Sequence, residues 1–148
     1  FYSIFQIRNE FNQDYFHILL IAIICISTDT GGYIFGKLLK GPKLTKLSPN
    51  KTYAGVIGSF LFSLIAGLVF IKYVDDIGFK NNDQLEVLLV ILFISFISQI
   101  GDLIISYFKR KAKLKDTGKI LPGHGGFLDR VDGLIFVMPV IYLMYLIN

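Results

Sequence analysis

The chain has 148 residues, enough for one domain, with 53% hydrophobic and only 18% charged residues. Its apolar residues are concentrated in long runs, which excludes an ordinary soluble domain and favours a membrane protein. A single cysteine, Cys25, excludes an internal disulfide. The net charge of +4 does not indicate a nucleic-acid partner, because the cations flank the apolar runs as at the cytoplasmic face of a membrane.

The first apolar run covers residues 15–39 and is long enough to cross a bilayer as one helix of about 37 Å. Asp29 falls inside this run, just before Gly31 and Gly32. One interpretation is that Asp29 caps a helix break at the two glycines. The other is that Asp29 is a site residue, because ionisable groups within a membrane usually face a cavity or a partner.

A basic loop follows at residues 37–51, with five lysines and two prolines. The positive-inside rule alone accounts for these lysines if the loop is cytoplasmic. A sharper interpretation is that Pro49 opens a helix, whose free N–H groups bind anions. In that interpretation Lys51 and Thr52 lie beside these N–H groups.

Two further spans are predicted at residues 54–73 and 85–108, separated by a net acidic loop. Small residues in the first of these favour close helix packing. A polar stripe with steps of three or four residues follows one face of the second; its members are Ser95, Ser98, Asp102, Ser106 and Lys109. An unpaired Asp102 would be costly there, so it should face protein, water or a cation. The alternative is that Asp102 merely pairs with Lys109 or Arg110.

The stretch of residues 106–132 combines seven cations, three carboxylates and four glycines between two apolar runs. Its cations are Lys109, Arg110, Lys111, Lys113, Lys115, Lys119 and Arg130, and its carboxylates are Asp116, Asp129 and Asp132. Basic groups with glycine-rich backbone suit phosphate, and closely spaced carboxylates suit a hard cation. Together they indicate metal-assisted phosphoryl or nucleotidyl transfer at a membrane surface.

Asp129 and Asp132 are three residues apart and would share one face of a helix. With Asp102 they form a set that suits one or two Mg²⁺ ions, while the lysines suit a triphosphate. His124 is read as an acid or base, a phosphate donor or a hydrogen-bonded loop residue. A positioning role for His124 is favoured, because transfer between phosphates needs little proton movement.

A final apolar run at residues 134–147 spans the membrane if it begins near Val131. Two spans separate the two basic loops, so both are predicted on the cytoplasmic side. This topology brings the end of the first span, the segment around Lys51 and the charged stretch to one face. The sequence predicts an all-α, polytopic transmembrane helix bundle of about four spans, a single transmembrane catalytic domain over residues 1–148.

The charged stretch resembles the C-terminal pattern of the phosphatidate cytidylyltransferases, also called CDP-diacylglycerol synthases. The matching residues are Ser106, Lys109-Arg110, Lys115-Asp116, Gly118, Leu121-Pro122, His124-Gly125-Gly126, Asp129-Arg130 and Asp132. Upstream, Gly101-Asp102, Asp29 to Tyr33 with Gly36, and Ser48-Pro49 with Lys51-Thr52 are similar to the same family. Members usually carry further membrane helices before this region, so we expect the chain to be the C-terminal part of a longer protein.

The resemblance implies a Mg²⁺-dependent reaction in phospholipid biosynthesis, in which a phosphate oxygen of phosphatidic acid attacks the α-phosphorus of CTP. The products are CDP-diacylglycerol and pyrophosphate. Asp102 and Asp129 would be the main metal ligands, and Asp132 would be a ligand or would support one. Phosphates would be bound by Lys109, Arg110 and Lys51; Lys115 and Arg130 would either do the same or pair with Asp116 and the other carboxylates.

The remaining implied substrate contacts are Asp29, Ser48, Thr52, Ser106, Asp116, His124, Gly125 and Gly126. The resemblance also implies K⁺ as a second cation, a homodimer, and a multi-pass protein of a bacterial inner membrane with its site facing the cytoplasm. The lipid would keep its acyl chains in the bilayer. Lys37, Asn50 and Ala54 depart from the family, which often has Arg, Lys and an acidic residue there.

Three other functions compete with this one. A CTP-dependent polyprenol or phytol kinase would share the spans and basic loops, but not the full pattern from Lys109 to Asp132. A transporter would distribute its polar residues along several spans, whereas here they crowd one face of the membrane. A non-catalytic paralogue would have to have lost activity outside the charged stretch, since all of its charged residues are present.

Overall fold

The computed structural model describes residues 15–44, 51–74, 83–112 and 128–147. The described residues form four α-helices: α2 Tyr15–Leu39, α3 Tyr53–Tyr73, α4 Gln84–Lys111 and α5 Leu128–Ile147. Within those ranges, strand-like pairing is limited to one isolated bridge between Lys43 and Thr52. The prediction of an all-α fold is confirmed.

Three of these helices, α2, α3 and α4, are long and apolar enough to cross a membrane. Many of their large apolar side chains are exposed, for example Ile57 and Ile65 of α3 at 62% each, as expected of helices that face lipid. The apolar part of α5 is shorter, Asp132–Met144, and α5 contains Pro139. A fourth span therefore stays a prediction.

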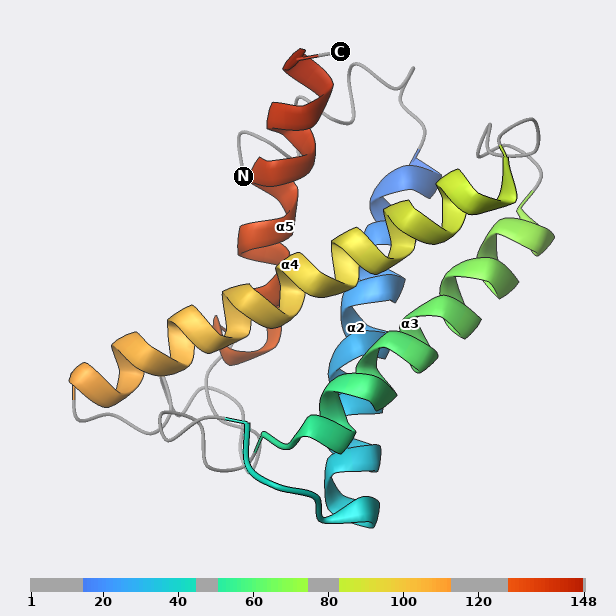
Figure 1. Cartoon of the computed structure of the whole chain (residues 1–148). Helices are drawn as coiled ribbons and strands as arrows, with labels where there is room; N and C mark the ends of the chain where they lie inside the picture. The colour runs from blue at the N-terminus through green and yellow to red at the C-terminus, as the bar shows by residue number, and fades with distance from the viewer. Residues whose placement is uncertain (1–14, 45–50, 75–82, 113–127, 148) are drawn as a thin grey trace.

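The helices pack as an antiparallel pair crossed by a third helix (Figure 1). α2 packs most extensively on α3, α4 lies obliquely across both, and α5 packs mainly on α4. The C-terminal ends of α2 and α4 and the N-terminal ends of α3 and α5 all lie toward the lower part of Figure 1. The end of α2, the start of α3 and the end of α4 therefore lie at the same end of the bundle, as the positions of the basic loops predict.

Glycines bring the backbones of α2 and α3 into direct contact. A Cβ atom built on Gly31 would lie 2.5 Å from the carbonyl oxygen of Gly58, and one on Gly55 would lie 2.8 Å from that of Gly32. α2 continues without interruption through Gly31 and Gly32. The interpretation that Asp29 caps a helix break there is wrong, because these glycines serve helix packing rather than a break.

Thr28 lies one helical turn before Gly31 and ties three helices together through hydrogen bonds. The side chain is 1% exposed, and its hydroxyl donates to the Ile24 carbonyl at 2.8 Å. The same hydroxyl lies 2.9 Å from Ser95 Oγ of α4, with which it shares a hydrogen bond. Ser59 of α3 donates its hydroxyl to the Thr28 carbonyl at 2.7 Å. Because little else can satisfy polar groups inside an apolar bundle, these bonds fix how the three helices sit together.

A second close approach sets α5 against α4. A Cβ atom on Gly101 would lie 2.8 Å from Cβ of Phe136, and Gly133 sits directly on the Ser98 side chain. Each of these glycines is next in sequence to an aspartate, Asp102 or Asp132. The contacts of these two glycines therefore bring the carboxylates of Asp102 and Asp132 close together.

We predict that Gly31→Ala destabilises the protein by about 1–3 kcal/mol, because the new methyl group forces the two backbones apart. Unfolding of the full-length protein in detergent micelles measures the effect. The matched control is Gly41→Ala, whose Cβ atom would meet nothing closer than 3.5 Å. Equal stabilities for the two variants would contradict the proposed backbone contact.

We also predict that Thr28→Val, which keeps the shape of the side chain, destabilises the protein by about 1–3 kcal/mol, since Ser95 Oγ loses its buried partner. The control is Thr30→Val on the same helix, because Thr30 is exposed and bonds only within α2, to the Ile26 carbonyl. The same unfolding assay applies. A loss as large in the Thr30 variant would mean that helix propensity, rather than the interhelical bond, is responsible.

Candidate active site

A cavity of about 320 Å³ lies where the four helices meet. Its polar lining residues are Thr28 and Asp29 from α2, Lys51, Thr52 and Ser59 from α3 and the segment before it, Gln99, Asp102 and Ser106 from α4, and Asp132 from α5. Such a polar cavity among apolar helices indicates a binding site rather than a packing defect.

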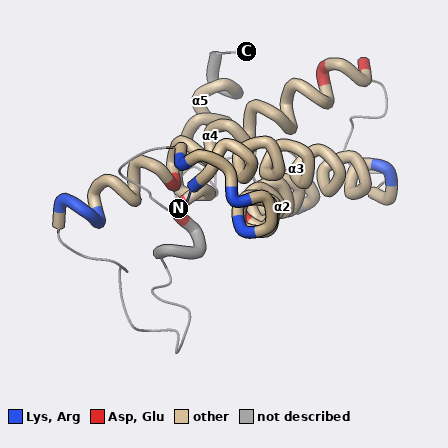
Figure 2. Tube along the Cα trace, turned by 60° about the horizontal axis from the view of Figure 1, so that its bottom comes forward, with Lys and Arg blue, Asp and Glu red and all other residues tan. Residues whose placement is uncertain are grey.

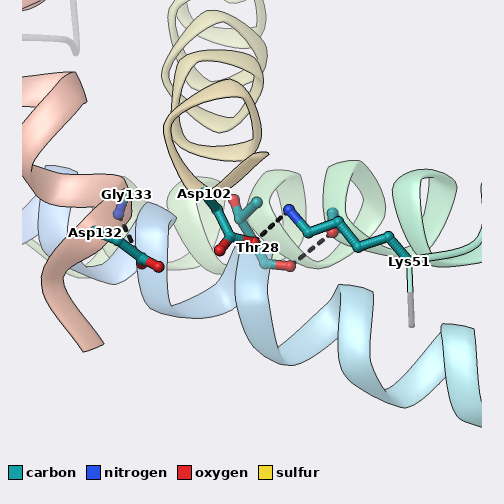
Figure 3. A network of polar contacts seen from close by, with 6 residues as sticks. Thr28, Lys51, Asp102, Asp132 and Gly133 are labelled. Carbon is teal, nitrogen blue, oxygen red and sulfur yellow. Dashed lines mark hydrogen bonds and ion pairs between the residues drawn. The ribbon is translucent and has the colours of Figure 1, made fainter. Parts of the chain in front are cut away.

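Lys51 and Asp102 form an ion pair across this cavity (Figure 3). Both side chains are about one-quarter exposed, at 25% and 26%. The pair joins the segment before α3 to the middle of α4. The alternative in which Asp102 merely pairs with Lys109 or Arg110 is therefore wrong, because Lys51 comes from the segment before α3 and points into a shared site.

The backbone before α3 places Lys51. The amide of Leu44 donates to the Lys51 carbonyl at 2.7 Å, and the amide of Tyr53 donates to the Pro42 carbonyl at 3.2 Å. Next to it, the Thr52 hydroxyl accepts a hydrogen bond from the Gly55 amide at 3.1 Å, so Thr52 is the N-cap of α3. These bonds hold Lys51 at the edge of the cavity.

This cap corrects the predicted helix start. α3 begins at Tyr53, so Pro49 does not open it, and Pro49 and Ser48 lie outside the described residues. A Thr hydroxyl is a favourable N-cap, because it accepts a hydrogen bond from one of the free amides in the first turn of the helix. In α3 this amide is that of Gly55. Thr52 lines the cavity as predicted, but its hydroxyl already accepts a bond from its own helix.

Asp132 faces Asp102 from the first turns of α5. Asp132 is 4% exposed, and its Oδ1 accepts a hydrogen bond from the Gly133 amide at 2.9 Å. Its carboxyl interacts with that of Asp102, and more weakly with that of Asp29. Figure 3 shows Asp132 and Asp102 pointing into the same space. Neighbouring carboxylates in a half-buried site favour a bound cation, since their mutual repulsion is otherwise uncompensated.

The donor set fits Mg²⁺, which is usually held by one or two carboxylates together with water and substrate phosphates. Asp102 and Asp132 provide the carboxylates, and Ser106 adds a hydroxyl on the same wall. Among the described residues no group of three His, Cys, Asp or Glu side chains is close enough to hold a metal alone. The backbone of Asp129 lies in the first turn of α5, but its side chain is not described.

The other predicted site residues divide into two groups. Lys109 and Arg110 lie in the last turn of α4, beyond the residues that line the cavity, and Figure 2 shows cations gathered at this helix end. The backbone of Arg130 lies at the start of α5. Those outside the described residues are Ser48, Lys115, Asp116, His124, Gly125 and Gly126. Their predicted roles stay predictions.

Sequence reasoning missed several lining residues. Ser59 is one of the small residues of residues 54–73 that are expected only to favour helix packing, whereas it lines the cavity and also bonds to α2. Thr28 and Gln99 were not singled out. The signal was present for both, because Thr28 precedes Asp29 and Gln99 lies one helical turn before Asp102.

The sequence is similar to known proteins over most of its length. The model of the cytidylyltransferase family matches residues 1–148. A phosphatidate cytidylyltransferase of Staphylococcus haemolyticus is 46% identical over 134 residues, covering 89% of this chain and 50% of that protein. Those of Staphylococcus saprophyticus and Staphylococcus aureus are 43% and 42% identical, each covering 95% of this chain and 53% of the relative. The chain spans about half the length of these curated relatives. It belongs to the cytidylyltransferase family.

Proposed function

We propose that this chain carries the residues that transfer the cytidylyl group of CTP to phosphatidic acid, giving CDP-diacylglycerol and pyrophosphate. The relatives named phosphatidate cytidylyltransferase support the reaction. The observation that carries the proposal is the convergence of Lys51, Asp102 and Asp132 in one cavity among apolar helices. A cation and paired carboxylates at that place suit two phosphorylated substrates, one from water and one from the membrane.

Asp102 and Asp132 would hold Mg²⁺, with Asp129 as a further ligand from the same turn of α5. When bound, the ion would neutralise the triphosphate and the charge that develops on the leaving pyrophosphate. Lys51 now pairs with Asp102. With that carboxylate engaged by a cation, the Lys51 ammonium would be free to bind an oxygen of a substrate phosphate.

The protein's main contribution is to position two anions that repel each other. An oxygen of the lipid phosphate must attack the α-phosphorus of CTP in line with the leaving pyrophosphate. Lys51 lines the cavity, and Lys109 and Arg110 lie beyond it in the last turn of α4, so cations would be available to both substrates. Ser106 adds a hydroxyl to the cavity lining.

The proposal places the protein in a bacterial inner membrane with the cavity open to the cytoplasm. Three helices long enough to cross a membrane support the membrane location. The cations in the last turn of α4 support a cytoplasmic position for that helix end. The acyl chains would then stay among the lipids while the headgroup meets CTP. The second cation, K⁺, and the homodimer implied by the family resemblance stay predictions.

The decisive experiment measures CTP-dependent pyrophosphate release by the full-length protein in detergent–phosphatidate micelles. Release should require phosphatidate and Mg²⁺, and chelation should abolish it. Asp132→Asn should lower kcat by at least about 100-fold, as does loss of one strong electrostatic group in other active sites. The control is Asp83→Asn, because Asp83 is exposed at the N-terminus of α4 and its side chain makes no capping bond.

Two other outcomes would redirect the assignment. Release of CDP with an isoprenoid alcohol as acceptor would indicate a lipid kinase. Absence of turnover with any lipid, from a protein that is folded, would leave a transporter or an inactive paralogue.

A second prediction follows from the ion pair of Lys51 with Asp102. Lys51→Met should raise KM for a phosphorylated substrate by about 10- to 100-fold, the usual value of a charge-assisted hydrogen bond. The same variant should lower the Mg²⁺ concentration needed for half-maximal rate, because Asp102 loses its competing partner. Lys72→Met, in the last turn of α3, is the control. A Lys51 variant that needs more Mg²⁺ would contradict this competition.

A further inference from the structure

The side-chain amide of Gln99 has a buried donor that is not hydrogen-bonded by the described residues. Its Nε2 atom is shielded from solvent and has no hydrogen-bond partner among the described residues. A buried amide donor without an acceptor costs about 1–3 kcal/mol. Ser98 Oγ, on the neighbouring residue, is also unpartnered, but Ser98 is packed on Gly133 and does not line the cavity. Gln99 does line the cavity, so a bound molecule can satisfy its amide.

The amide can reach such a molecule without any change in the helix. The terminal torsion of a glutamine side chain has a broad, shallow energy profile. A rotation about that torsion turns the N–H toward the cavity. The donor therefore needs an acceptor atom in the cavity, at the level of Gln99.

The level of Gln99 in the bundle identifies the acceptor. α4 ends in Lys109, Arg110 and Lys111, and Asp102 lies between that basic end and Gln99. Gln99 thus lies one helical turn, about 5 Å, farther from the basic end than the carboxylate proposed to hold Mg²⁺. A nucleotide arrives from the aqueous side, and its phosphates belong at Asp102. An acceptor on the far side of Asp102 from the basic end suits the lipid, which enters from the membrane.

In phosphatidic acid the groups directly beneath the phosphate are the glycerol carbons and then the two ester carbonyls. Ester carbonyl oxygens accept hydrogen bonds and carry no charge. A neutral amide donor suits them better than a cation, because a charge is more costly at this depth. The phosphate and an ester carbonyl are separated by a length comparable to the turn that separates Asp102 from Gln99.

We infer that Gln99 is a specificity-determining residue that donates a hydrogen bond to an ester carbonyl of the lipid substrate, distinguishing diacyl from ether-linked phosphatidate. This inference rests on the proposed function. It assigns Gln99 to the lipid rather than to the cytosine base, whose contacts would alter KM for CTP.

The test compares two lipids in the pyrophosphate-release assay with the full-length protein: a diacyl phosphatidate and its dialkyl ether analogue of equal chain length. Wild type should prefer the diacyl lipid by about 10-fold in kcat/KM, the value of one net hydrogen bond. Gln99→Met, similar in length and apolar, should lose about 10-fold on the diacyl lipid and nothing on the ether lipid. KM for CTP should not change in this variant.

The control variant is Phe96→Leu, since Phe96 is half-exposed on the same helix and does not line the cavity. It should keep the preference for the diacyl lipid. If Gln99→Met does not fold, Gln99→Asn replaces it, because the shorter amide is withdrawn from the cavity and should also lose the preference.

Several results would overturn the inference while leaving the proposed function standing. They are equal losses on both lipids, a raised KM for CTP, and a wild type that does not distinguish the lipids. A wild type without CTP-dependent pyrophosphate release would instead overturn the proposed function and this inference with it.

Discussion

Compensation of carboxylates inside an apolar bundle is the constraint on which the rest of this structure depends. Asp102 and Asp132 interact closely at the meeting point of α4 and α5, where isolated charges are costly. Lys51 is paired with Asp102 and brings a positive charge to this place. Its position depends on backbone bonds of the preceding segment and on the Thr52 cap. The hydrogen bonds of the segment before α3 therefore place the positive charge that compensates Asp102.

Small residues make this arrangement compatible with a membrane. Lipid offers little hydrophobic driving force between helices, so association depends on close contact and interhelical hydrogen bonds. Gly31 and Gly55 provide the contact between α2 and α3, and Thr28 provides bonds to both α3 and α4. The α2–α3 contact also borders the cavity, since Gly32 and Gly55 are among its lining residues.

Local pattern predicted the helices and the faces of their polar residues, as Asp102 and Ser106 on one wall of the cavity show. It could not predict which distant groups meet. The pairing of Lys51 with Asp102 depends on how α3 packs against α4. Pro49 suggested a helix start, whereas α3 begins after the N-cap Thr52. Gly31 and Gly32 suggested a break by local rules, whereas the packing of α3 stabilises a continuous helix. Roles assigned within residues 113–127 stay predictions.

Depth along α4 orders the chemistry proposed for the site. The cost of a charge rises toward the membrane centre, so charged recognition belongs near the basic end and neutral recognition deeper. α4 follows this order, with Lys109 and Arg110 at its end, Asp102 within the cavity and Gln99 one turn deeper. In the proposed complex, a lipid phosphate held at Asp102 through a cation would place its neutral ester groups near Gln99. The same helix would then help to bind the headgroup by charge and the ester groups by a neutral hydrogen bond.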